Sequence, residues 1–270
     1  MDFSELKLIT NRMRGSLIEM SHRAKGAHLG SSLSCVDILA VLYWNILNLD
    51  PKNPTDPIRD RFILSKGHAA AALYTTLAYR GFFPIELLET YGKTGSCLPE
   101  HPGRFCVPGV EVATGSLGHG LPIGLGMATA ARIKKYPFRV FVLMSDGECN
   151  EGSVWEAAML AASTKTDNLI AFIDYNKWQA TGRSKEIMAL EPLKQKWESF
   201  GWDAYEINGN DLESIYYTIK SAISNTGKPK IIIANTIKGK GVSFMEDDNN
   251  WHYRIPNEEE VIKSKMELGL

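Results

Sequence analysis

Residues 138–182, FRVFVLMSDGECNEGSVWEAAMLAASTKTDNLIAFIDYNKWQATG, decide the fold. The apolar, β-branched run at 139–144 predicts a strand, and the turn residues at 145–147 end it. Residues 153–156, Ser-Val-Trp-Glu, form a capping-box pattern that opens an Ala-rich helix to about residue 164, and 169–173 predicts a second strand. This strand–helix–strand unit predicts a right-handed crossover in which both strands end at the same edge of a parallel sheet.

Asp146 and Asn176 follow these two strands, thirty positions apart. A carboxylate and an amide oxygen are hard donors that suit Mg²⁺, which takes few protein ligands and completes its octahedron with phosphates and water. Taken singly, Asp146-Gly147 is also typical of an ordinary turn, and Asn176 of an ordinary strand end. The pair, joined by the crossover unit, favours a shared metal ion at the edge where open α/β sheets bind ligands.

Composition indicates an ordinary globular protein. The chain has 270 residues, 44% of them hydrophobic and 23% charged, with a net charge of −1 and a pI near 6.6. We therefore expect one domain spanning 1–270 and no attraction to nucleic acid or to an anionic membrane. The first residues lack the pattern of a signal peptide and no run is long enough for a membrane helix, so a cytoplasmic location is expected. The four cysteines lack zinc spacing and are expected to be reduced.

The remaining sequence predicts more of the same architecture. Helices are expected at 4–25, 35–47, 69–79, 84–91, 124–135, 190–200, 212–224 and 258–268, and further strands at 61–65, 110–114, 203–207 and 230–236. The fold class is therefore α/β, with a doubly wound, mostly parallel sheet flanked by helices. Residues 27–32 and 92–109 are expected to be loops.

Five predicted loops converge on one sheet edge, at 66–68, 115–120, 145–152, 174–178 and 237–241. Four loop histidines accompany them: His28, His68, His101 and His252. A single loop histidine is more often solvated or structural, and the glycine-rich turn at 115–120 lacks the spacing of a dinucleotide site. Together, however, these loops predict a site for a large ligand that carries phosphate.

The Asp-Gly pair followed thirty residues later by Asn resembles the motif of thiamine diphosphate enzymes. Glu151-Gly152 and the run 174–177, Asp-Tyr-Asn-Lys, are similar to the transketolase family. Further runs carry the resemblance across essentially the whole chain, namely 26–30 (GAHLG), 65–68 (SKGH), 101–102 (HP), 108–118 (PGVEVATGSLG) and 251–252 (WH). The resemblance is to the amino-terminal, diphosphate-binding domain and implies the thiamine diphosphate-binding fold.

By this resemblance, the side chains of Asp146 and Asn176 and the main-chain carbonyl of Trp178 would hold Mg²⁺, or Ca²⁺ or Mn²⁺. His28 and His101 would line the donor-sugar pocket, whereas Lys66 would add positive charge. The cofactor contacts implied are His68, Gly115, Leu117, Gly147, Glu151, Asn176, Ile237, Lys238 and His252. The four histidines would be the catalytic residues.

The resemblance also implies a partner. Transketolases continue into a pyrimidine-binding domain that this sequence lacks, so we expect the amino-terminal subunit of a split transketolase, active in an α2β2 heterotetramer with a carboxy-terminal subunit. It would transfer a two-carbon ketol unit from a ketose phosphate to an aldose. Alternatives are one component of a decarboxylating two-component enzyme, disfavoured by the four-histidine pattern, and a non-catalytic cofactor-binding subunit, disfavoured by the retention of Asp146, Asn176 and all four histidines. Departures from the family pattern at Ser145, His119 and Gly103 leave the sugar preference open.

Overall fold

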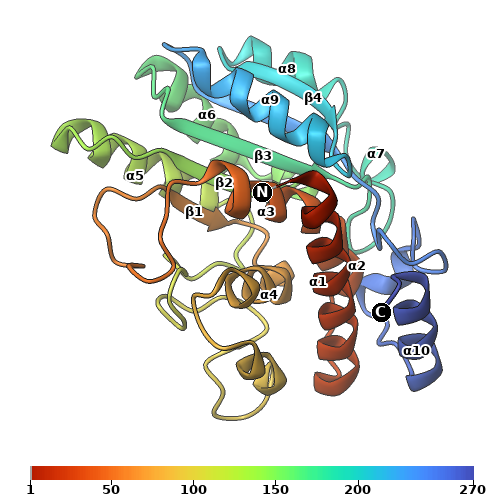
Figure 1. The fold of residues 1–270 in the computed structure, drawn as a ribbon. Coiled ribbons are helices and arrows are strands. Elements are labelled where there is room, and N and C mark those ends of the chain that lie inside the picture. The colour runs from red at the N-terminus through yellow and green to blue at the C-terminus, as the bar shows by residue number, and fades with distance from the viewer. Residues whose placement is uncertain (1) are drawn as a thin grey trace.

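The computed structural model describes residues 2–270 and contains one five-stranded sheet (Figure 1). The strands are β1 (Arg61–Leu64), β2 (Val140–Ser145), β3 (Leu169–Tyr175), β4 (Asp203–Asn208) and β5 (Lys230–Asn235). Their order is β1-β2-β3-β5-β4, and every pairing is parallel. The predicted α/β fold class is confirmed, and the sheet is parallel throughout these strands.

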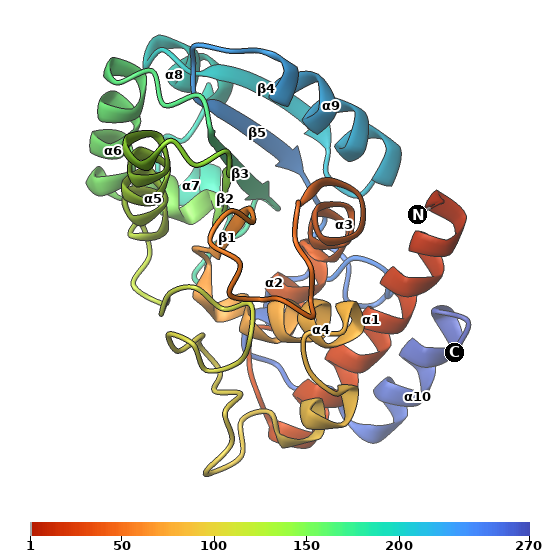
Figure 2. The same ribbon diagram turned by 60° about the vertical axis from the view of Figure 1, so that its left-hand side comes forward.

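Helices cover both faces of the sheet. They are α1 (Phe3–Ala24), α2 (Leu29–Ser34), α3 (Val36–Val41), α4 (Ala70–Arg80), α5 (Gly120–Lys134), α6 (Gly152–Ser163), α7 (Ser184–Ile187), α8 (Leu193–Ser199), α9 (Leu212–Ser224) and α10 (Glu258–Glu267). In Figure 2, α5 and α6 lie on one side of the sheet, and α3 and α9 on the other. Short 3₁₀ helices occupy 67–69, 85–90, 146–150 and 249–252, and a π-helical turn at Leu42–Ile46 follows α3.

Alternate residues of the central strands enter two separate cores. In β2, Phe141 and Leu143 pack with α1, α3, α4 and α9, whereas Val142 and Met144 pack with α5, α6 and α8. All six residues of β2 and all seven of β3 are buried, which explains why both read as continuous apolar runs. Gly124 permits close packing of α5, because a Cβ there would lie 2.5 Å from Val142.

Three expectations about local structure were wrong. The capping box expected at 153–156 does not form, because α6 begins at Gly152 and the Ser153 hydroxyl donates to the Gly118 carbonyl at 2.9 Å. Residues 110–114 are not a strand; Val110 packs into the core and Glu111 forms an ion pair with Arg59, so side-chain burial rather than strand pairing accounts for this apolar run. The loop expected at 27–32 gives way to helix α2 from Leu29, directly after His28, whose φ is +67°. Among residues 2–270, no helix combines the length and apolar character needed to span a membrane.

Candidate active site

A cleft of about 370 Å³ lies at the carboxyl edge of the sheet. It is lined by His28, Ser31, His68, His101, Gly115, Leu117, Ser145, Asp146, Gly147, Asn150, Glu151, Asn176, Trp178, Gln179, Ala180, Thr181 and His252. These residues follow β1, β2 and β3 and come from the 101–117 segment, the loop before α2, α2 itself and the 249–252 turn. The structure therefore brings together all but two of the predicted site residues.

The Asp146 carboxylate is 1% exposed at the tip of β2. Its Oδ2 accepts a hydrogen bond from Ser184 Oγ at 2.7 Å, and its Oδ1 accepts one from the Gly147 amide at 2.9 Å. Burial raises the pKa of Asp146 to about 6, against which the bond from Ser184 acts. A buried carboxylate with a raised pKa is a group that a bound cation would stabilise.

Asn176 lies just beyond the tip of β3, where Ser145 of β2 pairs with Asp174. Its Nδ2 donates to Asp174 Oδ2 at 3.4 Å, and its Oδ1 accepts from the Trp178 amide at 3.1 Å. Because a carboxylate only accepts hydrogen bonds, Asp174 fixes the orientation of the amide. The two strand tips therefore lie at the same edge, as the crossover argument predicted.

Lys66 and Asp174 form a fully buried ion pair beside the cleft. Lys66 Nζ also donates to the Ser31 carbonyl at 2.8 Å, while Asp174 accepts from the hydroxyls of Ser34 and Thr236. Burial opposes the charge on Lys66, but Asp174 raises its pKa overall. The Lys66 charge is therefore balanced inside the protein, and Lys66 is not among the residues that line the cleft.

Glu148, also fully buried, ties three segments together. Its carboxylate accepts hydrogen bonds from the Ser65 hydroxyl, the Gly118 amide at 3.0 Å and the Ser145 amide at 2.8 Å. Ser145 and Glu148 form a capping box, which gives the departure from the family pattern at Ser145 a structural role. The glycine loop around Gly118 is thereby fixed to the tips of β1 and β2.

The four histidines form one cluster. The His28 ring lies 5.4 Å from that of His68, 6.1 Å from that of His101 and 4.8 Å from that of His252, centroid to centroid. Burial lowers the pKa of His28 to about 4, that of His252 to about 3 and that of His68 well below its usual 6.5. These three imidazoles are therefore neutral at pH 7 and offer one donor and one acceptor each.

Ile237 and Lys238 are the two predicted cofactor residues that do not line the cleft. Lys238 Nζ donates to Asn249 Oδ1 at 2.7 Å and lies 3.1 Å from His252 Nδ1. Burial lowers the pKa of Lys238 to about 8. Lys238 therefore lies behind His252 and orients its ring.

Several residues of the cleft were missed in the sequence. Ser31 and Asn150 have no motif signal, and Gln179, Ala180 and Thr181 belong to a turn whose folding back was not foreseen. Ser31 directly follows the 26–30 run, and the other four lie close to Asn176 or to the Asp-Gly segment, so only this closeness could have indicated them.

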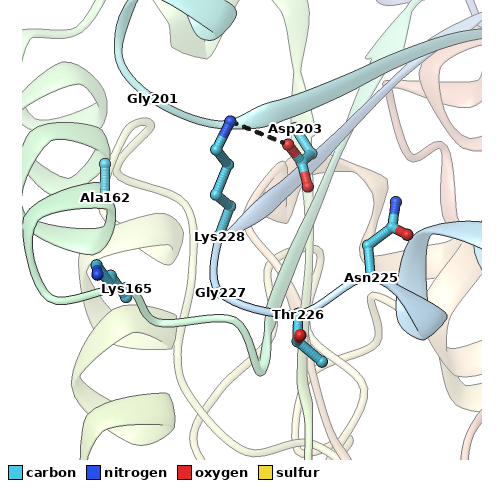
Figure 3. Close-up of a pocket in the computed structure, with 8 residues that line it drawn as sticks. All are labelled: Ala162, Lys165, Gly201, Asp203, Asn225, Thr226, Gly227 and Lys228. Atoms are coloured by element: carbon cyan, nitrogen blue, oxygen red, sulfur yellow. Dashed lines mark ion pairs between the residues drawn. The ribbon is translucent and has the colours of Figure 1, made fainter.

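A second hollow, of about 580 Å³, lies at the opposite edge of the sheet (Figure 3). Lys165, Asp203, Asn225 and Lys228 surround it, and a Lys228–Asp203 ion pair of 3.5 Å crosses it. Asp203 begins β4, and residue 230 begins β5, so this hollow is at the amino edge. Among the described residues it has no histidine and no buried carboxylate, so the smaller cleft is the candidate active site.

The cleft fits thiamine diphosphate held by a hard divalent cation. Asp146 and Asn176 supply oxygen donors, and residues 2–270 hold no group of three or more His, Cys, Asp or Glu side chains placed for a metal ion, so phosphate and water would complete the octahedron. His28 Nδ1 and Gln179 Nε2 are buried without a hydrogen-bond partner in the part of the chain the structure describes, as expected of groups that face a polar ligand. A Cβ on Gly115 would come within 3.0 Å of His101, so that position must stay open.

Comparisons with known proteins agree with the resemblance to transketolases. The family model described as transketolase, thiamine diphosphate binding domain, matches residues 6–270. One of the subunits of the apulose-4-phosphate transketolase of Phocaeicola vulgatus is 44% identical over 269 residues, covering 100% of this chain and 95% of that protein. The 6-deoxy-6-sulfo-D-fructose transketolase subunit SqwG of Clostridium sp. is 44% identical, covering 90% and 88%.

Solved structures give the same result. The transketolase of Campylobacter jejuni superposes with a TM-score of 0.94 at 33% identity, covering 100% of this chain and 43% of that one. The transketolase of Leishmania mexicana superposes with a TM-score of 0.92 at 29% identity, covering 98% of this chain and 41% of that one. The chain therefore spans less than half of these full-length enzymes.

The fold and the matched domain define a thiamine diphosphate-binding protein. The chain belongs to the transketolase family, and its relatives identify it as the amino-terminal subunit of a split, transketolase-type transferase. The sequence-based identification is confirmed, and nothing favours the decarboxylating or non-catalytic alternatives.

Proposed function

We propose that this chain is the cofactor- and metal-binding half of a two-component transketolase that moves a two-carbon ketol unit from a ketose phosphate to an aldose. The convergence of four histidines with Asp146 and Asn176 on one cleft carries the proposal. The relatives that match over nearly their full length are named as transketolase subunits acting on apulose-4-phosphate or 6-deoxy-6-sulfo-D-fructose. These names support a sugar substrate.

Asp146, Asn176 and the Trp178 carbonyl would hold Mg²⁺, with Ca²⁺ or Mn²⁺ as substitutes of the same donor chemistry. Gly115, Leu117, Gly147 and Glu151 would enclose the cofactor, whereas Ile237 and Lys238, which do not line the cleft, would act on it through neighbouring residues such as His252. When bound, thiamine diphosphate supplies the electron sink that lets a carbon–carbon bond beside a carbonyl break.

The chain's own contribution is positioning and proton exchange. His68 and His252, held neutral by burial, would donate hydrogen bonds to diphosphate or substrate oxygens. His28, with a free Nδ1, and His101 would contact the sugar hydroxyls and move protons there. Neutral imidazoles suit both tasks, because each can give a proton at one nitrogen and accept one at the other.

A separate carboxy-terminal partner would supply the pyrimidine-binding half of the site. The relatives from Phocaeicola vulgatus and Actinobacillus succinogenes are themselves named as transketolase subunits, which supports this partner, and an α2β2 assembly is the arrangement we propose. A cytoplasmic location stays a prediction.

The test is reconstitution. The chain is mixed with its carboxy-terminal partner subunit, thiamine diphosphate, Mg²⁺ and a ketose phosphate with an aldose acceptor, and aldose release and CO₂ release are followed separately. Aldose release that requires both chains and is abolished by a chelator supports the proposal. CO₂ release would instead indicate a decarboxylating enzyme, and the absence of both products would contradict transfer.

A further inference from the structure

The segment between Asn176 and α7 folds back on itself beside the cleft. The Gln179 amide donates to the Gly182 carbonyl at 2.9 Å, and Trp178 and Arg183 pair as in an antiparallel bridge. The fold-back brings Arg183 and Ser184, seven and eight residues beyond Asn176, to the two sides of the proposed metal site. Figure 1 shows α7, which begins at Ser184, beyond the end of β3.

We propose that Arg183 and Ser184 are positioning residues that hold this segment beside the cleft and fix the metal ligands on the strand tips. We call their contacts with Asp146, Trp178 and Asp247 the latch. The inference rests on the proposed metal role of Asp146, Asn176 and Trp178, and it adds two residues that touch neither cofactor nor substrate.

Ser184 acts on the Asp146 side. It is 1% exposed, and its hydroxyl donates to Asp146 Oδ2 at 2.7 Å. Its amide donates to the Lys177 carbonyl at 3.1 Å, which fixes Ser184 against the Asn176 side as well. With Gly147 on Oδ1 and Ser184 on Oδ2, the carboxylate cannot rotate freely, so its remaining lone pairs keep one direction.

Arg183 acts on the Trp178 side. Its guanidinium stacks 3.7 Å from the Trp178 ring centroid and donates through both terminal nitrogens to Asp247, each at 2.7 Å. The Trp178 indole N–H donates to the same carboxylate at 2.8 Å. A bidentate, stacked arginine is a geometrically specific contact that lysine cannot reproduce.

The latch also joins two loops. Asp247 belongs to the segment that carries His252, and the Asp247 amide donates to the Lys238 carbonyl at 2.8 Å. Asn249, which accepts from Lys238, donates through Nδ2 to the Ala180 carbonyl at 3.2 Å. The segment after β3, which carries Asn176 and Trp178, is therefore held to the segment that carries His252, and both would be positioned together.

Backbone strain accompanies this arrangement. Lys177, between the two proposed ligands Asn176 and Trp178, has φ +69°, and Asp247 has φ +58°. Non-glycine residues persist in this region only where surrounding contacts over-determine them. The Arg183–Asp247–Trp178 contacts provide that restraint at both residues.

The experiment measures Mg²⁺ affinity by calorimetry on the complex of this chain with its partner subunit, in the presence of thiamine diphosphate. Ser184→Ala and Arg183→Met should each weaken Mg²⁺ binding about tenfold or more, the usual effect of removing a group that orients a metal ligand. Arg183→Lys should recover only part of the loss. Lys185→Met, which removes the charge of an exposed neighbouring residue, is the matched control, and its Mg²⁺ affinity should stay within about twofold of wild type.

Thermal unfolding of the metal-free complex separates positioning from folding. Loss of Mg²⁺ affinity with a nearly unchanged unfolding temperature supports the latch, whereas Mg²⁺ affinity equal to wild type in both variants overturns it. A loss that follows the unfolding temperature, and that Arg183→Lys fully rescues, also overturns it by indicating a merely structural role. If the wild-type complex binds no Mg²⁺ at all, the proposed function itself fails, a result distinct from the others.

Discussion

The two edges of the sheet both carry a hollow and a lysine–aspartate ion pair, yet they differ in where the charges lie. At the amino edge, Lys228 and Asp203 are 58% and 27% exposed (Figure 3). At the carboxyl edge, Lys66 and Asp174 are both fully buried. Because removing a charge from water costs several kcal/mol per ion, only a dense set of partners or a ligand can maintain the second arrangement.

The partners at the carboxyl edge are unevenly distributed. Asp174 accepts from Lys66, Ser34, Thr236 and Asn176, so its charge is balanced within the protein. Asp146, equally buried, accepts hydrogen bonds from only a hydroxyl and an amide among residues 2–270. This difference separates Asp174, whose charge is balanced within the protein, from Asp146, which we propose as a ligand of the metal ion.

The largest expected effect is at Asp146. Asp146→Asn keeps the shape but removes the charge, so Mg²⁺-dependent binding of thiamine diphosphate should be lost, by more than about 100-fold. Calorimetry on the partner-assembled complex measures this. Asp203→Asn, the matched change at the amino edge, should leave the affinity within about twofold. Full binding by Asp146→Asn would remove the basis for the distinction between the edges.

The second effect is on stability. Lys66→Met leaves the Asp174 carboxylate buried without its cation and should lower the free energy of unfolding by about 3–5 kcal/mol. Lys228→Met, which breaks the exposed pair, should change it by less than about 1 kcal/mol. Urea denaturation of the chain compares the two, and the double variant Lys66→Met/Asp174→Asn should recover part of the loss. Equal effects at the two edges would mean that burial does not distinguish the pairs.

The site could be predicted from the sequence where local pattern determines it. Continuous apolar runs identified β2 and β3, and parallel topology alone then placed Asp146 and Asn176 at one edge. The partners of those residues could not be predicted in this way. The Lys66–Asp174 pair spans 108 residues and the Arg183–Asp247 pair 64, and neither belongs to a periodic pattern.

The failed strand at 110–114 has the same cause. Its β-branched residues gave a valid local signal, but whether such a segment pairs depends on its neighbours in space. Arg59 binds Glu111, and the Thr114 amide donates to the Pro102 carbonyl, so tertiary contacts decide the outcome.

Within the carboxyl edge, His101 is exposed at the cleft, whereas His252 is buried and His28 and His68 are half-buried. His101→Ala should lower kcat about 100-fold, the usual range for a proton-transfer group, while thiamine diphosphate affinity stays within about threefold. Steady-state kinetics and calorimetry on the assembled enzyme separate the two quantities. His22→Ala, which removes an imidazole bound to the Pro256 carbonyl outside the cleft, is the control. A large loss of cofactor affinity would place His101 among the cofactor-binding groups instead.

The smallest effect concerns pH and the buried histidines. Burial lowers the pKa of His252 from 6.5 to about 3. Below pH 6.5 the imidazole therefore binds a proton in the unfolded chain but stays neutral in the folded protein, so the free energy of unfolding falls as the pH falls from 6.5 toward 3. Asp146, with its pKa raised to about 6, acts in the opposite direction between about pH 6 and 4, because there the folded protein binds the extra proton. Between pH 7 and 5, His252→Asn should therefore lose about 1 kcal/mol less stability than wild type, a value reduced from the full linkage because the cleft is open to solvent. Urea denaturation at the two pH values measures the difference. Parallel losses in the two proteins would show that His252 is not held neutral by burial, and the cleft would then resemble the solvated amino edge.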